Sequence, residues 1–248
     1  MKNLIAISAK KRCGKDTAAI MIIDGMGANY GEPNAVSYAL AKPIKEALMH
    51  GLNSCHQPII VKGERVFRRW AMDDMNGLSD VDREEDLLMD CNDAHVILKS
   101  AWSYIELRKP ELKKFHTQAW NLIEDITSYD SEESVWSVRT LMQTFGTDVG
   151  VNADKIIWMR FLADVYIEAI RDNITLIVTD CRQDHEMDIM RRMGALVMHI
   201  DRPGYSDVVS DTHITEKGLN REPGDIVISN DDDLESFELK VLTAVGIK

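Results

Sequence analysis

The feature that most constrains the fold is an apolar segment that leads through a basic loop into a helical pattern. Residues Asn3–Ser8 are apolar and partly β-branched, which predicts a short, fully buried strand. The basic loop Ala9–Thr17 follows, and an apolar helical pattern continues to Ile23. Backbone N–H groups at the start of a helix, reached through a glycine, form a cradle for phosphate oxygens. We therefore expect this loop to bind the phosphates of a nucleotide.

Within the loop, residue types suggest individual roles. Gly14 permits close approach of the backbone, Lys15 reaches the terminal phosphates, and Asp16 or Thr17 lies near a Mg²⁺ ion. Ala9 stands where such loops usually have a first glycine, and the hydroxyl of Thr17 comes one place later than usual. The alternative is a basic surface turn. A bound polyphosphate explains four cations within six residues better, because the whole chain carries a net charge of −12.

Strand-like and helix-like segments alternate in the first 52 residues and again from about residue 136 to the end. The predicted strands after the first are Ala35–Tyr38, Thr175–Thr179, Ala195–Ile200 and Ile226–Ile228, and the predicted helices after the first are Lys42–Leu52, Asp184–Met193 and a final one after Asp232. This alternation predicts an α/β fold, with a parallel sheet that is covered by helices on both faces.

Residues 53–135 differ in character and are expected to form a mainly helical inserted subdomain, with 1–52 and 136–248 as the core of a single domain. Apolar residues repeat at helical spacing from Leu87 to Leu98. The acidic run Asp80–Asp93 is interpreted as a solvated face. Trp102, Trp120 and Trp136 are expected to pack in the interior rather than to stack on bases.

A second group of polar residues follows a predicted buried strand. Asp180 and Arg182 come at its carboxyl end, where open α/β sheets bind ligands, and Glu186 lies on the first turns of the next helix. The alternative is a structural ion pair between Asp180 and Arg182. Arg139 and Gln143 lie four residues apart and share a helix face, which suits a phosphate and a base edge but is also common on solvated helices.

Composition excludes several classes of protein. The net charge of −12 argues against binding to nucleic acid, because a negative surface repels a phosphate backbone. No apolar stretch is long enough to span a bilayer, which takes roughly 20 residues. The four cysteines form no C-x-x-C pair, so neither a zinc site nor a disulfide framework is suggested, and a cytoplasmic setting is expected.

Several motifs taken together resemble one family, the deoxynucleoside monophosphate kinases of T-even-type bacteriophages. These motifs are Gly14–Thr17, Leu40–Lys45, Asp82–Glu84, Trp136–Asp148, Asp180–Asp188, Asp211–Glu216 and Asp225–Asp231. The resemblance implies a P-loop NTPase fold with a five-stranded parallel sheet, a monophosphate-binding insertion and a lid near residues 201–216. It also implies transfer of the γ-phosphoryl group of ATP, with Mg²⁺, to a deoxynucleoside 5′-monophosphate, and hence small nucleotide substrates. A homodimer is a further expectation.

The resemblance also implies roles for residues at matching positions. Arg12, Gly14, Lys15, Asp16 and Thr17 correspond to the ATP side. The acceptor side comprises Lys11, Ile44, Lys45, Arg83, Arg139, Gly146, Thr147, Trp158, Asp180, Arg182, Gln183, Glu186, Thr212 and His213. Gln143 is added to this side because of its spacing from Arg139. Lys15, Arg139, Asp180 and Arg182 are the candidates for catalysis, and Trp158 is a candidate wall against the deoxyribose.

Three other functions remain open at this point. A different small-molecule kinase of the same fold, such as a dephospho-coenzyme A kinase, would share the phosphate loop. A regulatory nucleotide switch would need a guanine-reading N-K-x-D loop, which the sequence lacks. A binding module with an inactive loop would account for Ala9 and Asp16.

Overall fold

The computed structural model describes the whole chain except residues 1–2, 11–12, 30–31, 129–134, 204–218 and 248. The chain divides into two compact units, Met1–Leu40 with Met159–Lys248, and Ala41–Trp158. Residues 53–135, expected as an insertion, all lie in the second unit, which extends further along the chain in both directions.

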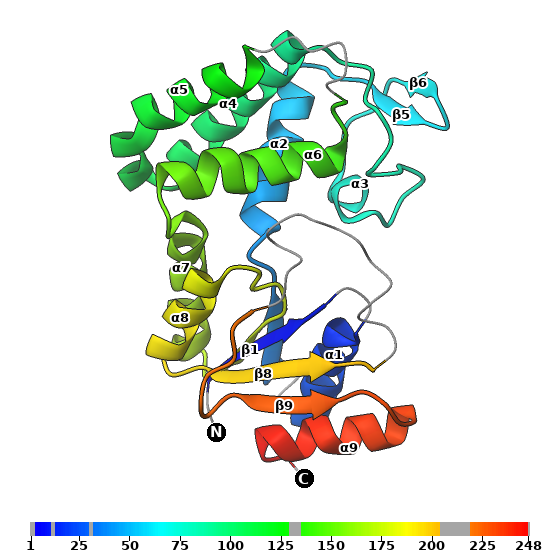
Figure 1. The fold of residues 1–248 in the computed structure, drawn as a ribbon, viewed down its shortest axis with the longest axis vertical. Helices are drawn as coiled ribbons and strands as arrows, with labels where there is room; N and C mark the ends of the chain where they lie inside the picture. Colours follow the sequence, from blue (N-terminus) through cyan, green and yellow to red (C-terminus); the bar gives the residue numbers. More distant parts are fainter. Residues whose placement is uncertain (1–2, 11–12, 30–31, 129–134, 204–218, 248) are drawn as a thin grey trace. The chain divides into compact units, whose positions relative to one another are not determined.

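The first unit is built on a five-stranded sheet in which all strands run parallel (Figure 1). Its strands are β1 (Leu4–Ala9), β4 (Ala35–Tyr38), β7 (Thr175–Val178), β8 (Leu196–Asp201) and β9 (Ile226–Ser229), and their order is β4-β7-β1-β8-β9. A short antiparallel pair, β2 (Ala28–Asn29) and β3 (Glu32–Pro33), precedes β4. The five-stranded parallel sheet implied by the resemblance is confirmed, and all five predicted strands form within one residue of their expected bounds.

Helices cover both faces of this sheet because the side chains of the central strand alternate between two apolar cores. Ile5 and Ile7 on β1 pack with residues of α1 (Lys15–Met26) and α9 (Leu234–Val245). Leu4 and Ala6 face the opposite core, with residues of α7 (Ile157–Arg171) and α8 (Asp184–Arg192). Because both faces are buried, β1 is apolar except for Ser8 and does not alternate in polarity.

The second unit is largely helical. Its helices are α2 (Lys42–Ser54), α3 (Met72–Asn76), α4 (Cys91–Arg108), α5 (His116–Thr127) and α6 (Val138–Gln143), with a 3₁₀ segment at Pro110–Phe115 and a π-helical segment, η2, at Thr144–Val151. Strands β5 (Ile59–Val61) and β6 (Glu64–Val66) form a hairpin that helical periodicity did not predict. Leu87 is buried but lies before α4. The helix begins after Asp90, whose carboxylate caps it by accepting a hydrogen bond from the amide of Asp93 at 2.8 Å.

The interior of the second unit confirms two of the three expected tryptophan placements. Trp102 is fully buried and Trp136 nearly so. Trp120 is only half-buried, and its ring lies 4.5 Å from that of His116 and 4.2 Å from the Lys99 ammonium. In the acidic run, Asp82 and Asp86 accept backbone N–H bonds from Glu84 and Leu88, so these carboxylates also shape the chain locally.

Candidate functional site

The basic loop lies between β1 and α1, at the carboxyl end of the central strand. Gly14 precedes the first residue of α1 with φ +101°, a conformation that favours glycine. The side-chain amide of Asn230, which follows β9, donates to the carbonyl oxygen of Cys13 at 3.0 Å. A Cβ atom on Gly14 would lie 2.7 Å from that same amide nitrogen. The loop is therefore held from β9 by a contact that leaves no room for a side chain at position 14.

Lys15 begins α1, and its ammonium nitrogen lies 2.8 Å from the carboxylate of Asp16. The Asp16 side chain is 73% exposed, and Thr17 is exposed as well. An exposed ion pair of this kind contributes little to stability, so an anionic ligand can displace it at small cost. Lys11 and Arg12, expected to flank this point, fall outside the described residues.

Asp180 follows β7 at the same carboxyl edge of the sheet. Its carboxylate accepts a hydrogen bond from the backbone amide of Leu40, just beyond β4, at 2.6 Å. Arg182 is exposed and Gln183 is half-buried. The structure thus places Asp180, Arg182 and Gln183 on the edge where the phosphate loop begins. This hydrogen bond of Leu40 was not predicted, because it uses a backbone amide and residue type does not reveal which amide takes part.

Glu186 is buried and bonds to the loop that carries Arg182. One carboxylate oxygen of Glu186 accepts from the amides of Arg182 at 2.9 Å and Gln183 at 3.1 Å, which completes a capping box at the start of α8. Burial raises the pKa of this carboxyl group to about 7, and the two amide bonds oppose that rise. In this structure the Glu186 side chain therefore orients the loop from beneath.

In the second unit, two candidate cations lie at the end of α3, and a third is joined to the segment that follows this helix. The Lys45 ammonium donates to the side chain of Asn76 at 2.8 Å. The guanidinium of Arg83 lies against Gly77, the residue after α3, where a Cβ would come within 2.9 Å of its Nε. Arg139 is joined to the segment after α3 through its backbone amide, which donates to the carbonyl of Arg83 at 2.9 Å.

The Arg139 side chain is itself restrained, because its Nε lies 3.4 Å from the carboxylate of Glu84. Each of the three candidate cations thus contacts α3 or the segment that follows it. Asn76 and Glu84 hold two of them, and residue type alone did not single out either for this role.

The remaining candidates of this unit lie along α6 and η2. Gln143 ends α6, and Gly146 and Thr147 lie in η2. Ile44 contacts the Gly146 position, where a Cβ would be 3.0 Å from its Cδ1. Trp158 is only 4% exposed, and its indole N–H donates to the carbonyl of Gly146 at 2.8 Å.

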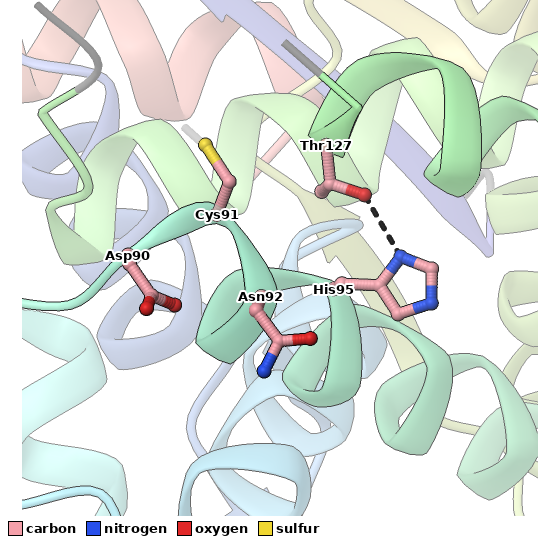
Figure 2. A pocket seen from close by; sticks show the side chains of 5 residues that line it. All are labelled: Asp90, Cys91, Asn92, His95 and Thr127. Atoms are coloured by element: carbon pink, nitrogen blue, oxygen red, sulfur yellow. Dashed lines mark hydrogen bonds between the residues drawn. The ribbon is translucent and has the colours of Figure 1, made fainter. Parts of the chain in front are cut away.

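A separate pocket of about 270 Å³ lies at the start of α4 and contains none of the expected site residues (Figure 2). It is lined by Asp90, Cys91, Asn92, His95 and Thr127, and His95 Nδ1 bonds the Thr127 hydroxyl at 2.8 Å. Burial, together with the nearby Lys99, lowers the pKa of His95. The figure shows Asp90 and Cys91 pointing away from this hydrogen bond, so the lining side chains do not converge on one point.

Some of the predicted site residues are not among the described residues. Thr212 and His213, with most of the expected lid at 201–216, fall outside the described residues. Among the residues that are described, no three His, Cys, Asp or Glu side chains form a metal-binding group. No helix in that same part of the chain is long and apolar enough to cross a membrane.

Comparison with known proteins gives one consistent result. A family model described as deoxynucleotide monophosphate kinase matches residues 3–241. The chain is 36% identical over 260 aligned residues to the deoxynucleotide monophosphate kinase of Enterobacteria phage T4, covering 98% of this chain and 99% of the relative. It is 34% identical over 251 residues to the protein of the same name from Escherichia phage RB69, covering 96% and 97%.

Proposed function

Since the chain belongs to the deoxynucleotide monophosphate kinase family, we propose that it transfers the γ-phosphoryl group of ATP to a deoxynucleoside 5′-monophosphate. The products are ADP and a deoxynucleoside diphosphate, which supplies phage DNA synthesis. The observation that best supports an ATP site is the loop at Cys13–Lys15, which opens α1 at the carboxyl edge of a parallel sheet. Backbone amides at such a helix start bind phosphate oxygens.

On the ATP side, Lys15 contacts the transferred phosphoryl group, and Gly14 lets the backbone approach the phosphates. Arg12, Asp16 and Thr17 complete this side in the proposal. Lys15 is presented from the first position of α1, and its ammonium group pairs with the exposed carboxylate of Asp16. Asp180 and Arg182 act at the same edge of the sheet, where Arg182 neutralises a phosphate and Asp180 holds the backbone at Leu40.

On the acceptor side, Lys45, Arg83 and Arg139 bind the monophosphate. Their contacts with α3 and with the segment that follows it support this assignment. The other proposed contacts to this nucleotide come from Lys11, Ile44, Gln143, Gly146, Thr147, Gln183, Thr212 and His213. Glu186 and Trp158 support the acceptor side through the backbone groups that they bind.

The reaction needs positioning and charge neutralisation more than covalent help from the protein. An acceptor phosphate is already anionic near neutral pH, so no general base is required. Asp16 and Thr17 offer the hard oxygen donors that suit Mg²⁺, which usually keeps several waters and binds chiefly through nucleotide phosphates. When bound, Mg²⁺ neutralises charge on the phosphates of ATP. We expect the substrates to be free nucleotides in the cytoplasm of the infected cell rather than nucleic acid.

The alternatives are less well supported. The match to the family covers the acceptor-side motifs as well as the phosphate loop, which does not favour a dephospho-coenzyme A kinase. A nucleotide switch or an inactive binding module would lack a requirement for an acceptor. The need for a monophosphate therefore separates the proposed kinase from both.

The test is a coupled assay of ADP formation with purified protein and Mg-ATP. Each deoxynucleoside monophosphate and the matching ribonucleotide is added in turn. We expect acceptor-dependent turnover that falls at least ~100-fold in Lys15→Ala, because the cation that neutralises the transferred phosphoryl group is lost. Lys113→Ala, at an exposed position in the second unit, is the matched control. ADP formation that is equal with and without a monophosphate, or none at all while ATP still binds, rejects the proposal.

A further inference from the structure

The segment η2, Thr144–Val151, continues α6 as a π-helix of eight residues. The π-helix is rare, and where it interrupts an α-helix it is frequently associated with a functional site. Two residues proposed for the acceptor side, Gly146 and Thr147, lie within it. The conformation of η2 therefore decides where the Thr147 side chain points.

One side chain holds this segment from the interior. The indole N–H of Trp158 donates to the carbonyl oxygen of Gly146 at 2.8 Å, and Trp158 is 4% exposed. A buried indole N–H normally needs a partner, so this bond fixes both the ring and the carbonyl.

Two glycines let the segment come this close to its neighbours. A Cβ on Gly150 would lie 2.5 Å from the ring of Trp158 and 2.9 Å from the carbonyl of Phe145. A Cβ on Gly146 would lie 3.0 Å from Ile44 Cδ1. Any larger residue at position 150 must move either the ring or the backbone of η2.

The indole is in turn fixed by a row of buried aromatic rings. Its ring centroid is 6.0 Å from that of Phe145, which lies 6.5 Å from that of Trp102. Both partner rings are fully buried. Little of the Trp158 surface is left for a deoxyribose, which argues against its expected role as a wall.

We propose that Trp158 is a positioning residue, which together with Gly150 sets the π-helical conformation of η2 and so presents Thr147 to the acceptor nucleotide. This inference rests on the proposed function and deepens it, because it assigns acceptor affinity to a backbone conformation behind the site. Neither Trp158 nor Gly150 needs to touch the nucleotide.

The first test compares Trp158→Phe with Trp70→Phe. Both substitutions keep an aromatic ring and remove one buried indole bond to a carbonyl in the second unit, since Trp70 donates to Gln57 at 2.8 Å. We expect Trp158→Phe to raise the KM for the monophosphate about fivefold, the effect of one hydrogen bond, with the KM for ATP unchanged. Trp70→Phe should change neither KM, although both variants lose similar stability. Equal rises in the two KM values for Trp158→Phe overturn the proposal.

A second comparison separates positioning from contact with the sugar. A positioning residue weakens the binding of deoxy- and ribonucleoside monophosphates by the same factor, whereas a wall changes the ratio of their dissociation constants. We expect an unchanged ratio in Trp158→Phe and in Gly150→Ala. A changed ratio overturns the proposal.

Amide hydrogen exchange supplies a readout that does not depend on activity. Faster exchange across residues 144–151 is expected in Trp158→Phe and not in Trp70→Phe. Unchanged exchange in η2 overturns the proposal even where the kinase assay succeeds. Conversely, a wild-type protein that turns over no monophosphate rejects the proposed function, while exchange still shows whether Trp158 sets the conformation of η2.

Discussion

The carboxylate of Asp180 accepts a hydrogen bond from the backbone amide of Leu40, with 2.6 Å between oxygen and nitrogen. This bond joins the ends of two neighbouring parallel strands, β7 and β4. Leu40 is the last residue of the first unit before the chain continues into α2. A carboxylate expected to act on a ligand therefore also fixes the backbone at the exit from the sheet.

Substitutions at Asp180 should separate these two roles. Asp180→Asn keeps an oxygen that can accept from Leu40, so its free energy of unfolding should stay within ~0.5–1 kcal/mol of the wild type. Turnover should still fall at least ~10-fold, because the charge is lost. Asp180→Ala should lose turnover and also about 1–3 kcal/mol, because the Leu40 amide loses its acceptor. Urea titration and the ADP assay measure both quantities, and full turnover in Asp180→Asn would show that only the hydrogen bond matters.

Glu186 should give the stability of the protein a pH dependence near neutrality. Its pKa rises from 4.5 to about 7 in the folded state, with burial as the main cause. The folded state therefore holds the proton more tightly, and this contribution to stability is full below about pH 4.5 and is lost as the pH rises through 7. A shift of this size corresponds to at most about 3 kcal/mol.

The measurement is the free energy of unfolding of wild type and Glu186→Gln at several values between pH 5 and 8. The difference between the two proteins should change over this range in favour of the variant, because glutamine does not titrate and can still accept the bonds from Arg182 and Gln183. A difference that is constant with pH contradicts the prediction.

Asp225 should be the most important carboxylate for the stability of the first unit. Its side chain is 5% exposed and accepts bonds from Arg191 at 2.7 Å and His199 at 3.0 Å, and from the amide of Glu222. Burial alone would raise its pKa, but these bonds outweigh that effect and lower it to about 2. Asp225→Ala should cost about 3 kcal/mol, because Arg191 and His199 lose a buried partner.

The matched control is Asp188→Ala, which removes another carboxylate bonded to Arg191 but at a side chain 47% exposed. Its cost should be below ~1 kcal/mol. Because the pKa of Asp225 is lowered on folding, its contribution is present above about pH 4 and is lost as the pH falls through 2. In an acid titration, the free energy of unfolding should therefore fall more steeply with pH in the wild type than in Asp225→Ala. Equal costs for the two variants reject this assignment.

Gly14 and Asn230 should be energetically coupled. Gly14→Ala introduces a Cβ at φ +101° that would lie 2.7 Å from the Asn230 amide, so both strain and a clash are expected. Asn230→Ala alone removes the bond to the Cys13 carbonyl and should cost about 1 kcal/mol. The double variant should be more stable than the sum of the single changes predicts, because the clash disappears while the strain remains. Additive free energies would show that the contact does not restrict the loop.

Much of the fold could be predicted from local pattern. Asn3–Ser8 was predicted to be a buried strand because Leu4–Ile7 are all apolar, and Pro43 suited the first turn of α2. The β5–β6 hairpin could not be predicted, because three-residue strands are too short to show a period of two. The apolar spacing from Leu87 to Leu98 predicts one continuous helix. The helix begins only at Cys91, because Asp90 caps its start.

The residues of the candidate site also differ in whether the sequence alone could predict them. Lys15 and Gly14 stand out because a phosphate loop is a local arrangement within one strand, one turn and one helix. Asn230 and Asn76 carry no such signal, since their contacts with Cys13 and Lys45 join residues far apart in the chain.

The sequence by itself determined the α/β class, the position of the phosphate loop and the resemblance to a kinase family, because these depend on residues within a few places of one another. Only the tertiary structure decided that Glu186 is buried beneath its loop, that Trp158 binds the carbonyl of Gly146 and that η2 is a π-helix. Each of these depends on which groups are removed from water together, and desolvation is a property of the packed chain rather than of a residue type.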